Sequence, residues 1–199
     1  MSLNNLDTDV TETELVDAGF EVVNLVSTIE LNQELDLNWI ATKLPSAEYQ
    51  PERFPFLVYR PAQIQATSMV PTNGTVSTAG AKSKEKLVEA NEKLLSELST
   101  LGVPIRTSSE ELSVQNIVIS SEFDTELDLS TIAIGLGLER CEYEPEQFPG
   151  LIYRMENGTT GLIFNTGKYL VTGANTYKQA IEGANIILSE LESLEIELD

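Results

Sequence analysis

One thirteen-residue segment occurs twice in the chain, and this repeat constrains the fold more than any other feature. EYQPERFPFLVYR at 48–60 returns as EYEPEQFPGLIYR at 142–154, with nine of the thirteen positions identical. Shorter motifs keep the same order around it: VVNLV at 22–26 and VQNIV at 114–118, then ELDL at 34–37 and at 126–129. A shared order of this length predicts a tandem duplication.

The seam of this duplication lies near residues 101–111, which divides the chain into three expected parts. Residues 1–19 contain five acids and no base, and they are typical of an acidic flexible tail. The first repeat is expected to cover 20–107 and the second to cover 108–199. Any functional surface is therefore expected in two related copies.

Each repeat is expected to have the element order β-α-β-β-β-β-α. The first strand of each repeat is predicted at 20–30 and at 112–122, where apolar side chains recur at strand spacing. A short helix follows, with Asp36 or Asp128 as its N-cap residue. The last element is a long amphipathic helix, at 83–100 and at 176–193. This order predicts an α+β fold with helices on one face of an antiparallel sheet.

The sheet face away from the helices is the one expected to carry function. Because side chains alternate along a strand, this face carries uncharged residues in both repeats: Val22, Asn24, Val26 and Thr28, then Val114, Asn116, Val118 and Ser120. The opposite side is expected to pack under the helices: Val23, Leu25 and Ile29, then Ile117 and Ile119. Two halves joined edge to edge would display one long concave surface, and an exposed patch of that size usually marks a binding site.

Charge and composition narrow the class of protein further. The chain has 32 Asp and Glu against 12 Lys and Arg, a net charge of −20, and 13 of these net negative charges fall in 108–199. Such a chain would ordinarily be repelled by nucleic acid and by anionic membranes. Because salt screens surface carboxylates, the balance favours a protein adapted to concentrated salt over an ordinary acidic protein.

The sequence offers little for catalysis and nothing for membrane insertion. It has no histidine, which excludes Ser-His-Asp and Cys-His catalysis and the usual imidazole metal sites. Its single cysteine, Cys141, excludes an intrachain disulfide. No apolar run reaches the roughly 18 residues of a membrane span, and the acidic N-terminus does not resemble a signal peptide. We therefore expect an intracellular, cytoplasmic and nucleoid-associated protein that is not an enzyme and needs no cofactor.

The repeated motifs resemble a known family. VQNIV, ELDL, EYEPEQFPGLIYR and LIFNTGKYLVTGA are similar to the second repeat of archaeal TATA-box-binding proteins, and the match covers about 20–199. The resemblance implies a pseudo-two-fold saddle that binds and bends the minor groove of AT-rich promoter DNA. It also implies recruitment of transcription factor B and RNA polymerase by a monomer on DNA, while self-association off DNA stays open. Proteins of this family are the standard example of minor-groove wedging.

The resemblance assigns DNA-binding roles to named positions. Asn24 and Asn116 would donate hydrogen bonds to minor-groove acceptors, and aliphatic neighbours would exclude the guanine amino group. The expected contacts of the second repeat are Val118, Leu162, Leu170 and Thr172 on bases, Phe148 and Phe164 as wedges, and Arg154 and Lys168 on phosphates. Those of the first repeat are Val26, Met69, Phe54 and Arg60. Each of these residues also has a purely structural interpretation. Asparagines in strands often form local hydrogen bonds, and a phenylalanine before proline is often part of the hydrophobic core.

The first repeat departs from the family pattern. Pro71 stands where a second wedging phenylalanine is expected, and Ala79 and Ser77 replace the equivalents of Thr172 and Leu170. Phe56 replaces the glycine that appears as Gly150, and it is a candidate substitute wedge. The first repeat is therefore expected either to kink DNA weakly or to use Phe56.

The acidic loop of the second repeat indicates a protein partner. Glu144, Glu146 and Gln147 resemble the loop that contacts factor B in the family, and a carboxylate-rich loop suits a basic partner. The alternative function is a divergent paralogue that binds factor B or a regulator with weak or no TATA binding. An enzyme or small-ligand carrier on a curved sheet is the least favoured possibility.

Overall fold

The computed structural model describes residues 10–196, which form two compact units. One unit consists of residues 23–116, and the other combines the residues before 23 with those after 116. Each unit contains one repeat of the sequence and is described separately below. Helix α1 (Glu12–Asp17) precedes the first repeat, and the short 3₁₀ helix η1 (Ser109–Glu111) lies between the repeats.

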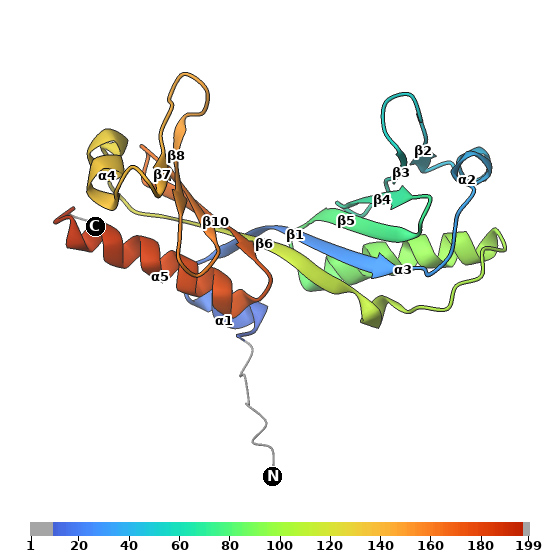
Figure 1. The fold of residues 1–199 in the computed structure, drawn as a ribbon. Coiled ribbons are helices and arrows are strands. Elements are labelled where there is room, and N and C mark those ends of the chain that lie inside the picture. The colour runs from blue at the N-terminus through green and yellow to red at the C-terminus, as the bar shows by residue number, and fades with distance from the viewer. Residues whose placement is uncertain (1–9, 197–199) are drawn as a thin grey trace, which may run out of the picture. The chain divides into compact units, whose positions relative to one another are not determined.

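The first unit is a five-stranded antiparallel sheet with helices packed on one face (Figure 1). The strand order is β2-β3-β4-β5-β1. The strands are β1 (Glu21–Glu30), β2 (Ala47–Glu48), β3 (Phe56–Tyr59), β4 (Thr67–Pro71) and β5 (Thr75–Ala81). The helices are α2 (Leu37–Lys43) and α3 (Lys84–Thr100), and α3 packs against β4 and β5.

The second unit repeats this plan, with the strand order β6-β10-β9-β8-β7. Its strands are β6 (Ser113–Glu122), β7 (Cys141–Glu142), β8 (Gly150–Arg154), β9 (Thr160–Phe164) and β10 (Lys168–Ala174). Its helices are α4 (Leu129–Leu136) and α5 (Tyr177–Ser193), and α5 packs against β9 and β10. The predicted α+β class and the element order of both repeats are confirmed.

Matching local interactions explain why the two sequences form the same elements. Asp36 caps α2 by accepting the backbone N–H of Trp39 at 2.9 Å, and Asp128 caps α4 by accepting that of Ser130 at 3.0 Å. The thirteen-residue motif forms the same turn twice, because the N–H of Phe54 donates to the carbonyl of Gln50 and that of Phe148 donates to the carbonyl of Glu144, each at 3.0 Å. The shared motif is thus a shared turn between short strands.

Alternation along the first strands places most of the core as predicted, with three exceptions. Leu25 and Ile29 are buried in the first unit, and Ile117 and Ile119 are buried in the second. The prediction is wrong at the start of β1, where Val22 is buried and Val23 is partly exposed, and at Ser120 on β6, which is buried. The pairing of β1 with β5 shifts register between Leu25 and Val26, and the extra residue of this bulge, Gly80, lies in β5.

The prediction of a tail over 1–19 needs correction at α1, while residues 1–9 lie outside the described part of the chain. The side chain of Thr11 and that of Glu14 form a capping box at the start of α1. Leu15 is fully buried, and the hydroxyl of Tyr177 on α5 donates to Glu12 at 3.0 Å. A single buried leucine and this bond hold α1 on the second unit, which the acidic composition did not indicate.

A hydrogen-bonded polar cluster lies in the core of the first unit, between the sheet and α3. Asn91 donates through Nδ2 to the carbonyl of Leu87 at 2.8 Å and to the hydroxyl of Ser27 at 3.4 Å. The Thr78 hydroxyl donates to Asn91 Oδ1 at 3.1 Å and lies 2.9 Å from that of Ser68. These polar side chains are buried and supply hydrogen-bond partners for one another, as buried polar groups require.

Candidate nucleic-acid interface

Each sheet has a face opposite its helices, which we call the open face. In the first unit four open-face residues lie side by side across neighbouring strands: Thr28, Ser77, Met69 and Val58. All four are partly exposed and none is charged. The residues that alternate with them, such as Leu57 and Val70, are fully buried towards the helices. The open face is therefore an uncharged surface with aliphatic and hydroxyl groups.

The open face of the second unit is built in the same way and is more apolar. Its corresponding row is Ser120, Leu170, Leu162 and Ile152. Leu162, Leu170 and Ile152 are partly exposed, whereas Ser120 is buried. Thr172 lies one step further along β10, opposite Thr160, and is also partly exposed. The structure thus brings Leu162, Leu170 and Thr172 together on one face, as the sequence predicts.

The amide of Asn24 is held in one orientation by the backbone. Its Oδ1 accepts the N–H of Gly80 at 2.8 Å, and Gly80 has a φ of +99°, which glycine adopts without strain. This bond uses the acceptor end of the amide, so the Nδ2 donor end is the part that can serve a base. Val26 lies nearby opposite Ala79, and Asn116 and Val118 are partly exposed on β6.

The two phenylalanines predicted as wedges in the second unit lie together. The ring centroids of Phe148 and Phe164 are 5.8 Å apart in an edge-on arrangement with an interplanar angle of 63°. Both side chains are partly exposed. In the first unit Phe54 pairs with Phe56 instead, at 5.5 Å and 24°. Phe54 is 45% exposed, so an aromatic pair reaches solvent in each unit.

The predicted phosphate contacts are exposed, and two of them form matching ion pairs. Arg60 lies 3.8 Å from the carboxylate of Glu48, and Arg154 lies 3.3 Å from that of Glu142. Exposed pairs of this kind contribute little to stability. Lys168 is exposed at the start of β10. Sequence analysis missed both pairs, although each glutamate begins the repeated thirteen-residue motif.

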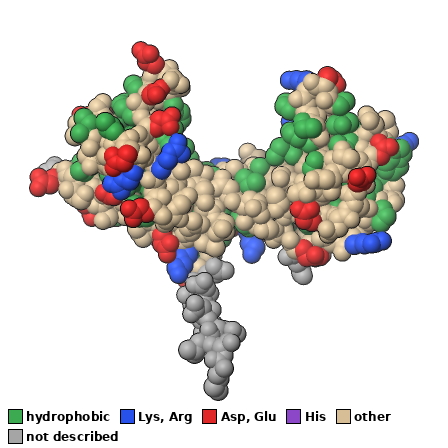
Figure 2. Space-filling model, in the orientation of Figure 1, with side chains coloured by type: hydrophobic (Ala, Val, Ile, Leu, Met, Phe, Trp, Pro, Cys, Tyr) green, Lys and Arg blue, Asp and Glu red, His purple; other side chains and the backbone are tan. Residues whose placement is uncertain are grey.

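The predicted partner loop connects β7 with β8. Glu144, Glu146 and Gln147 are exposed there, and the amide of Gln147 donates to the carboxylate of Glu144. Figure 2 shows acidic side chains at this loop, whereas the corresponding loop of the first unit carries both signs of charge, from Glu52 and Arg53. The two loops share a backbone turn and differ in charge.

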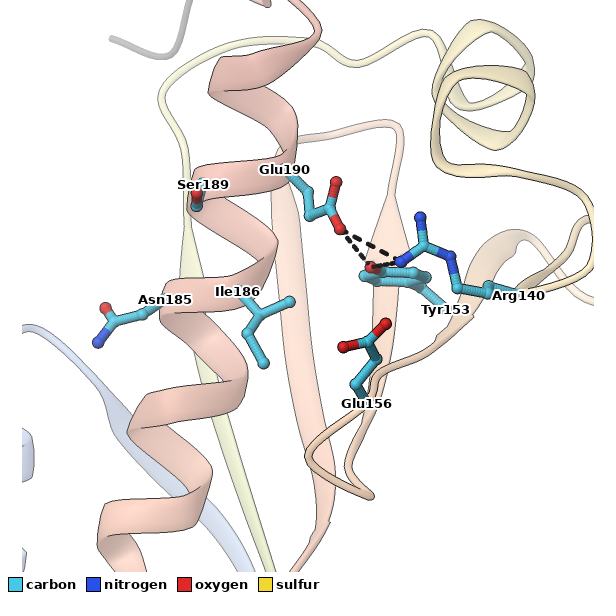
Figure 3. A pocket seen from close by; sticks show the side chains of 7 residues that line it. All are labelled: Arg140, Tyr153, Glu156, Asn185, Ile186, Ser189 and Glu190. Carbon is cyan, nitrogen blue, oxygen red and sulfur yellow. Dashed lines mark hydrogen bonds and ion pairs between the residues drawn. The ribbon is translucent and has the colours of Figure 1, made fainter.

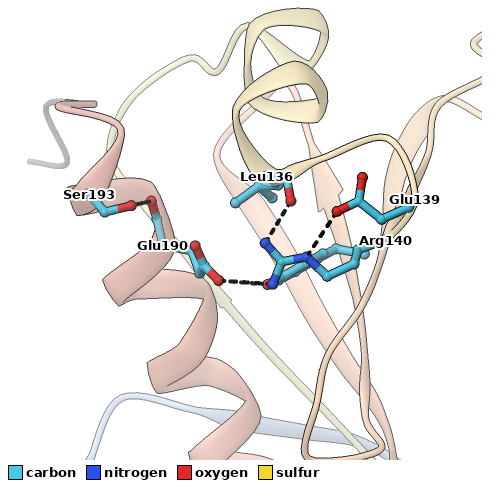
Figure 4. A network of polar contacts seen from close by, with 6 residues as sticks. Leu136, Glu139, Arg140, Glu190 and Ser193 are labelled. Atoms are coloured by element: carbon cyan, nitrogen blue, oxygen red, sulfur yellow. Dashed lines mark hydrogen bonds and ion pairs between the residues drawn. The ribbon is translucent and has the colours of Figure 1, made fainter.

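A polar cavity that sequence analysis missed lies between α5 and β8 (Figure 3). Its volume is about 400 Å³, and its lining includes Arg140, Tyr153, Glu156 and Glu190. The Tyr153 hydroxyl donates to Glu190 at 2.9 Å (Figure 3), and Arg140 donates to the carbonyl of Leu136 at 2.7 Å (Figure 4). Because these lining groups already form hydrogen bonds with one another, we assign the cavity a structural role and not a ligand-binding one. Residues 10–196 contain no cluster of Asp, Glu, Cys or His that could hold a metal ion.

The cavity gives a pH dependence to stability. Burial raises the pKa of Tyr153 to about 12, and the neighbouring Glu190 carboxylate adds to this shift. A raised pKa means that the unfolded chain loses the proton first, so the stabilisation is complete below about pH 10 and is lost as the pH rises towards 12. We expect Tyr153→Phe to make the fall in stability between pH 10 and 12 shallower in urea titrations followed by circular dichroism. Ser189→Ala, in the same cavity, is the control and should leave the profile unchanged.

The fold and the open faces together define a class: two tandem α+β repeats, each with an uncharged sheet face opposite its helices. The family model described as transcription factor TFIID (or TATA-binding protein, TBP) matches residues 19–101 and 111–194. The chain therefore belongs to the TATA-box-binding protein family, and the resemblance inferred from its motifs is confirmed. Within residues 10–196 no helix is long and apolar enough to cross a membrane.

Relatives from archaea support this assignment. TATA-box-binding protein 1 of Haloferax volcanii is 40% identical over 87% of this chain and 92% of its own length. TATA-box-binding protein E of Halobacterium salinarum is 40% identical over 87% and 93% of the two chains. The solved structure of Methanococcus jannaschii TBP is 35% identical, with a TM-score of 0.77 over 88% of this chain and 99% of that one.

Proposed function

We propose that this chain is a transcription initiation factor that binds and bends the minor groove of TATA-type promoter DNA. The observation that carries the proposal is the uncharged, partly exposed row on the open face of each repeat. The minor groove of A·T pairs presents only acceptors, whereas G·C adds an amino donor. Amide donors surrounded by aliphatic side chains can bond the acceptors of A·T pairs and leave no room or acceptor for the amino group of G·C pairs.

Each predicted site residue has a role in this proposal. Asn24 and Asn116 donate to base acceptors, and the bond from Gly80 supports this orientation of the Asn24 amide. The aliphatic contacts with base edges are Val26, Met69, Val118, Leu162 and Leu170, and Thr172 adds a hydroxyl. Phe148 and Phe164 insert between base steps and unstack them, at a cost of a few kcal/mol per step that the bent duplex offsets with further contacts. Arg60, Arg154 and Lys168 contact phosphates.

Bending of a labelled TATA duplex tests the proposal directly. Fluorescence resonance energy transfer between the duplex ends should report bending by the wild-type chain at molar KCl. Phe148→Ala/Phe164→Ala should lose the part of the bend that the second repeat contributes and bind about 10- to 100-fold more weakly, since base–aromatic stacking contributes roughly 1–3 kcal/mol per base. Leu188→Ala, an exposed change on α5, is the control and should bend DNA normally. Absence of bending by the wild type at every salt concentration would refute the proposal.

The salt dependence of binding should be unusually weak. Three phosphate contacts alone would give a slope of log K against log salt of roughly −2.7. Arg60 and Arg154 must leave Glu48 and Glu142 to reach phosphates, and each freed carboxylate attracts a cation in place of the one released. Two of the three released cations are thereby replaced, so we expect binding that is nearly flat with KCl, with a slope no steeper than about −1. Glu48→Gln/Glu142→Gln should restore a steeper fall, whereas Glu52→Gln/Glu146→Gln, with the same charge change, should not.

The acidic loop of the second repeat is proposed to recruit transcription factor B, which in turn brings RNA polymerase. Glu144 and Glu146 are exposed on a loop that lacks basic residues, which suits a basic partner surface. Glu144→Lys/Glu146→Lys should abolish capture of factor B in a pull-down while leaving DNA bending intact. Glu52→Lys, in the corresponding loop of the first repeat, is the control. Unchanged capture by the double variant would place the contact elsewhere.

A second candidate function is a paralogue that docks factor B or a regulator without productive DNA binding. Pro71 favours it, because this residue lies opposite Phe56 where the second repeat has Phe164 opposite Gly150. Ala79 and Ser77 also replace Thr172 and Leu170. Capture of factor B by a wild-type chain that produces no shift of TATA DNA would support this function over the first.

A further inference from the structure

The first repeat has exchanged an aromatic ring between two neighbouring strands. In the second unit Phe164 on β9 lies opposite Gly150 on β8. In the first unit the same pair of positions is held by Pro71 on β4 and Phe56 on β3. The equivalence is fixed by the following turns, since the N–H of Gly167 donates to the carbonyl of Phe164 and that of Gly74 donates to the carbonyl of Pro71, each at 3.1 Å. Each strand pair therefore keeps one phenylalanine, but on opposite strands.

Steric exclusion explains why each strand pair carries a single phenylalanine. A Cβ atom on Gly150 would lie 2.8 Å from the ring of Phe148 and 3.0 Å from that of Phe164. With any larger residue at position 150 on β8, at least one of these two rings would have to shift. In the first unit Pro71 brings no ring, and position 56 can carry one. The change from phenylalanine to Pro71 and the change from glycine to Phe56 are therefore coupled. Together they leave room for one ring beside Phe54, as there is beside Phe148.

The exchanged ring lies on the open face. Along β3 the side chains of Leu57 and Tyr59 are buried towards the helices, whereas Phe56 and Val58 alternate with them and are partly exposed. Phe56 stacks on Phe54 at 5.5 Å, and both rings line a small surface hollow together with Val58 and with polar or charged side chains: Glu48, Gln50, Arg53 and Arg60. An aromatic pair beside aliphatic open-face residues is what a minor-groove wedge needs.

We infer that Phe54 and Phe56 form the wedge of the first repeat, so that this repeat inserts an aromatic pair at its end of the DNA site although Pro71 cannot. The inference rests on the proposed DNA binding and adds to it the residue that replaces the missing phenylalanine. The pair differs from that of the second repeat in geometry, because its rings are stacked at 24° and not edge-on at 63°. The Phe54 ring comes from the turn before β3 and the Phe56 ring from the first residue of β3, and the stacked pair enters the base step together.

Site-specific unstacking separates the two wedges. We would place 2-aminopurine at either end of an asymmetric AT-rich duplex and measure its fluorescence gain on binding at molar KCl. Phe56→Ala should remove the gain at one end, and Phe164→Ala should remove it at the other. Phe56→Ala should also weaken binding about tenfold, since one stacking contact is lost. Leu188→Ala should leave both signals unchanged.

A strand swap keeps the inference testable if Phe56→Ala disturbs folding. Pro71→Phe alone should crowd Phe56 and reduce the signal, whereas Phe56→Gly/Pro71→Phe recreates the arrangement of the second repeat and should restore unstacking. Unstacking at both ends that survives Phe56→Ala, or a swap that gives no signal while the wild type does, would overturn the inference alone. A wild-type chain that unstacks neither end would overturn the proposed function as well.

Discussion

Gly167→Ala is expected to destabilise the second unit by roughly 3–5 kcal/mol, a large share of the stability of an ordinary domain. Gly167 has a φ of +88°, which costs an L residue energy wherever it occurs. A Cβ at this position would also lie 2.2 Å from the carbonyl oxygen of Phe123 and 2.5 Å from that of Thr125. Both atoms belong to backbone, which cannot move aside cheaply. The same turn positions Phe164, so the variant should also lose DNA bending.

Gly102→Ala separates the two causes. Gly102 has a φ of +91°, but a Cβ there would meet nothing within 4 Å. This variant should therefore cost only about 1 kcal/mol, the conformational part of the effect. Urea unfolding followed by circular dichroism measures both variants. Equal losses for Gly102→Ala and Gly167→Ala would contradict the close approach of the turn to the chain after β6.

Asn91→Ala is expected to destabilise the first unit by about 2–4 kcal/mol. The substitution removes the bonds from Asn91 to Leu87 and Ser27 and leaves the hydroxyl of Thr78 without this acceptor in the core. It also opens a cavity where the asparagine side chain was fully enclosed. The chain has one tryptophan, Trp39 on α2 of the same unit, so its fluorescence reports unfolding of the first repeat.

A double variant tests whether the cluster acts as a unit. Removing both partners of a buried hydrogen bond lowers the free energy of unfolding by less than the sum of the two single substitutions, because no polar group is then left unsatisfied. Thr78→Val/Asn91→Ala should thus cost about 1 kcal/mol less than the sum of the single changes. Asn185→Ala, an exposed asparagine on α5, should change stability by no more than about 0.5 kcal/mol. Additive losses for Thr78 and Asn91 would show that their hydrogen bond contributes little.

Several features of the site followed from local sequence. The alternation around Asn24 and Asn116 identified the open face, because strand geometry depends only on neighbours along the chain. Asp36 and Asp128 identified helix starts for the same reason, since a cap acts within three residues. The aromatic pair of Phe148 and Phe164 was reached through the repeat and the family resemblance, and the structure brings the two rings together.

Other features lay beyond such reasoning because they join residues distant in sequence. The pairing of Arg140, Tyr153 and Glu190 depends on how α5 packs on β9 and β10, and the burial of Leu15 depends on the contact between α1 and α5. The bond between Asn24 and Gly80 spans 56 positions and needs the bulge in β5. Composition described the first residues as a tail, because a six-residue helix is stabilised only by what it packs against.

The order of residues was enough to predict a duplicated α+β chain with an uncharged sheet face in each half. Repeated motifs, helix caps and strand alternation each depend on residues close together in the chain, so they can be recognised in the sequence. Three contacts became visible only in the folded chain: Phe56 opposite Pro71, Asn91 in a buried polar cluster, and the ion pairs of Glu48 and Glu142 with Arg60 and Arg154. Strand register and packing between elements set these contacts, and both depend on the whole unit closing around its core.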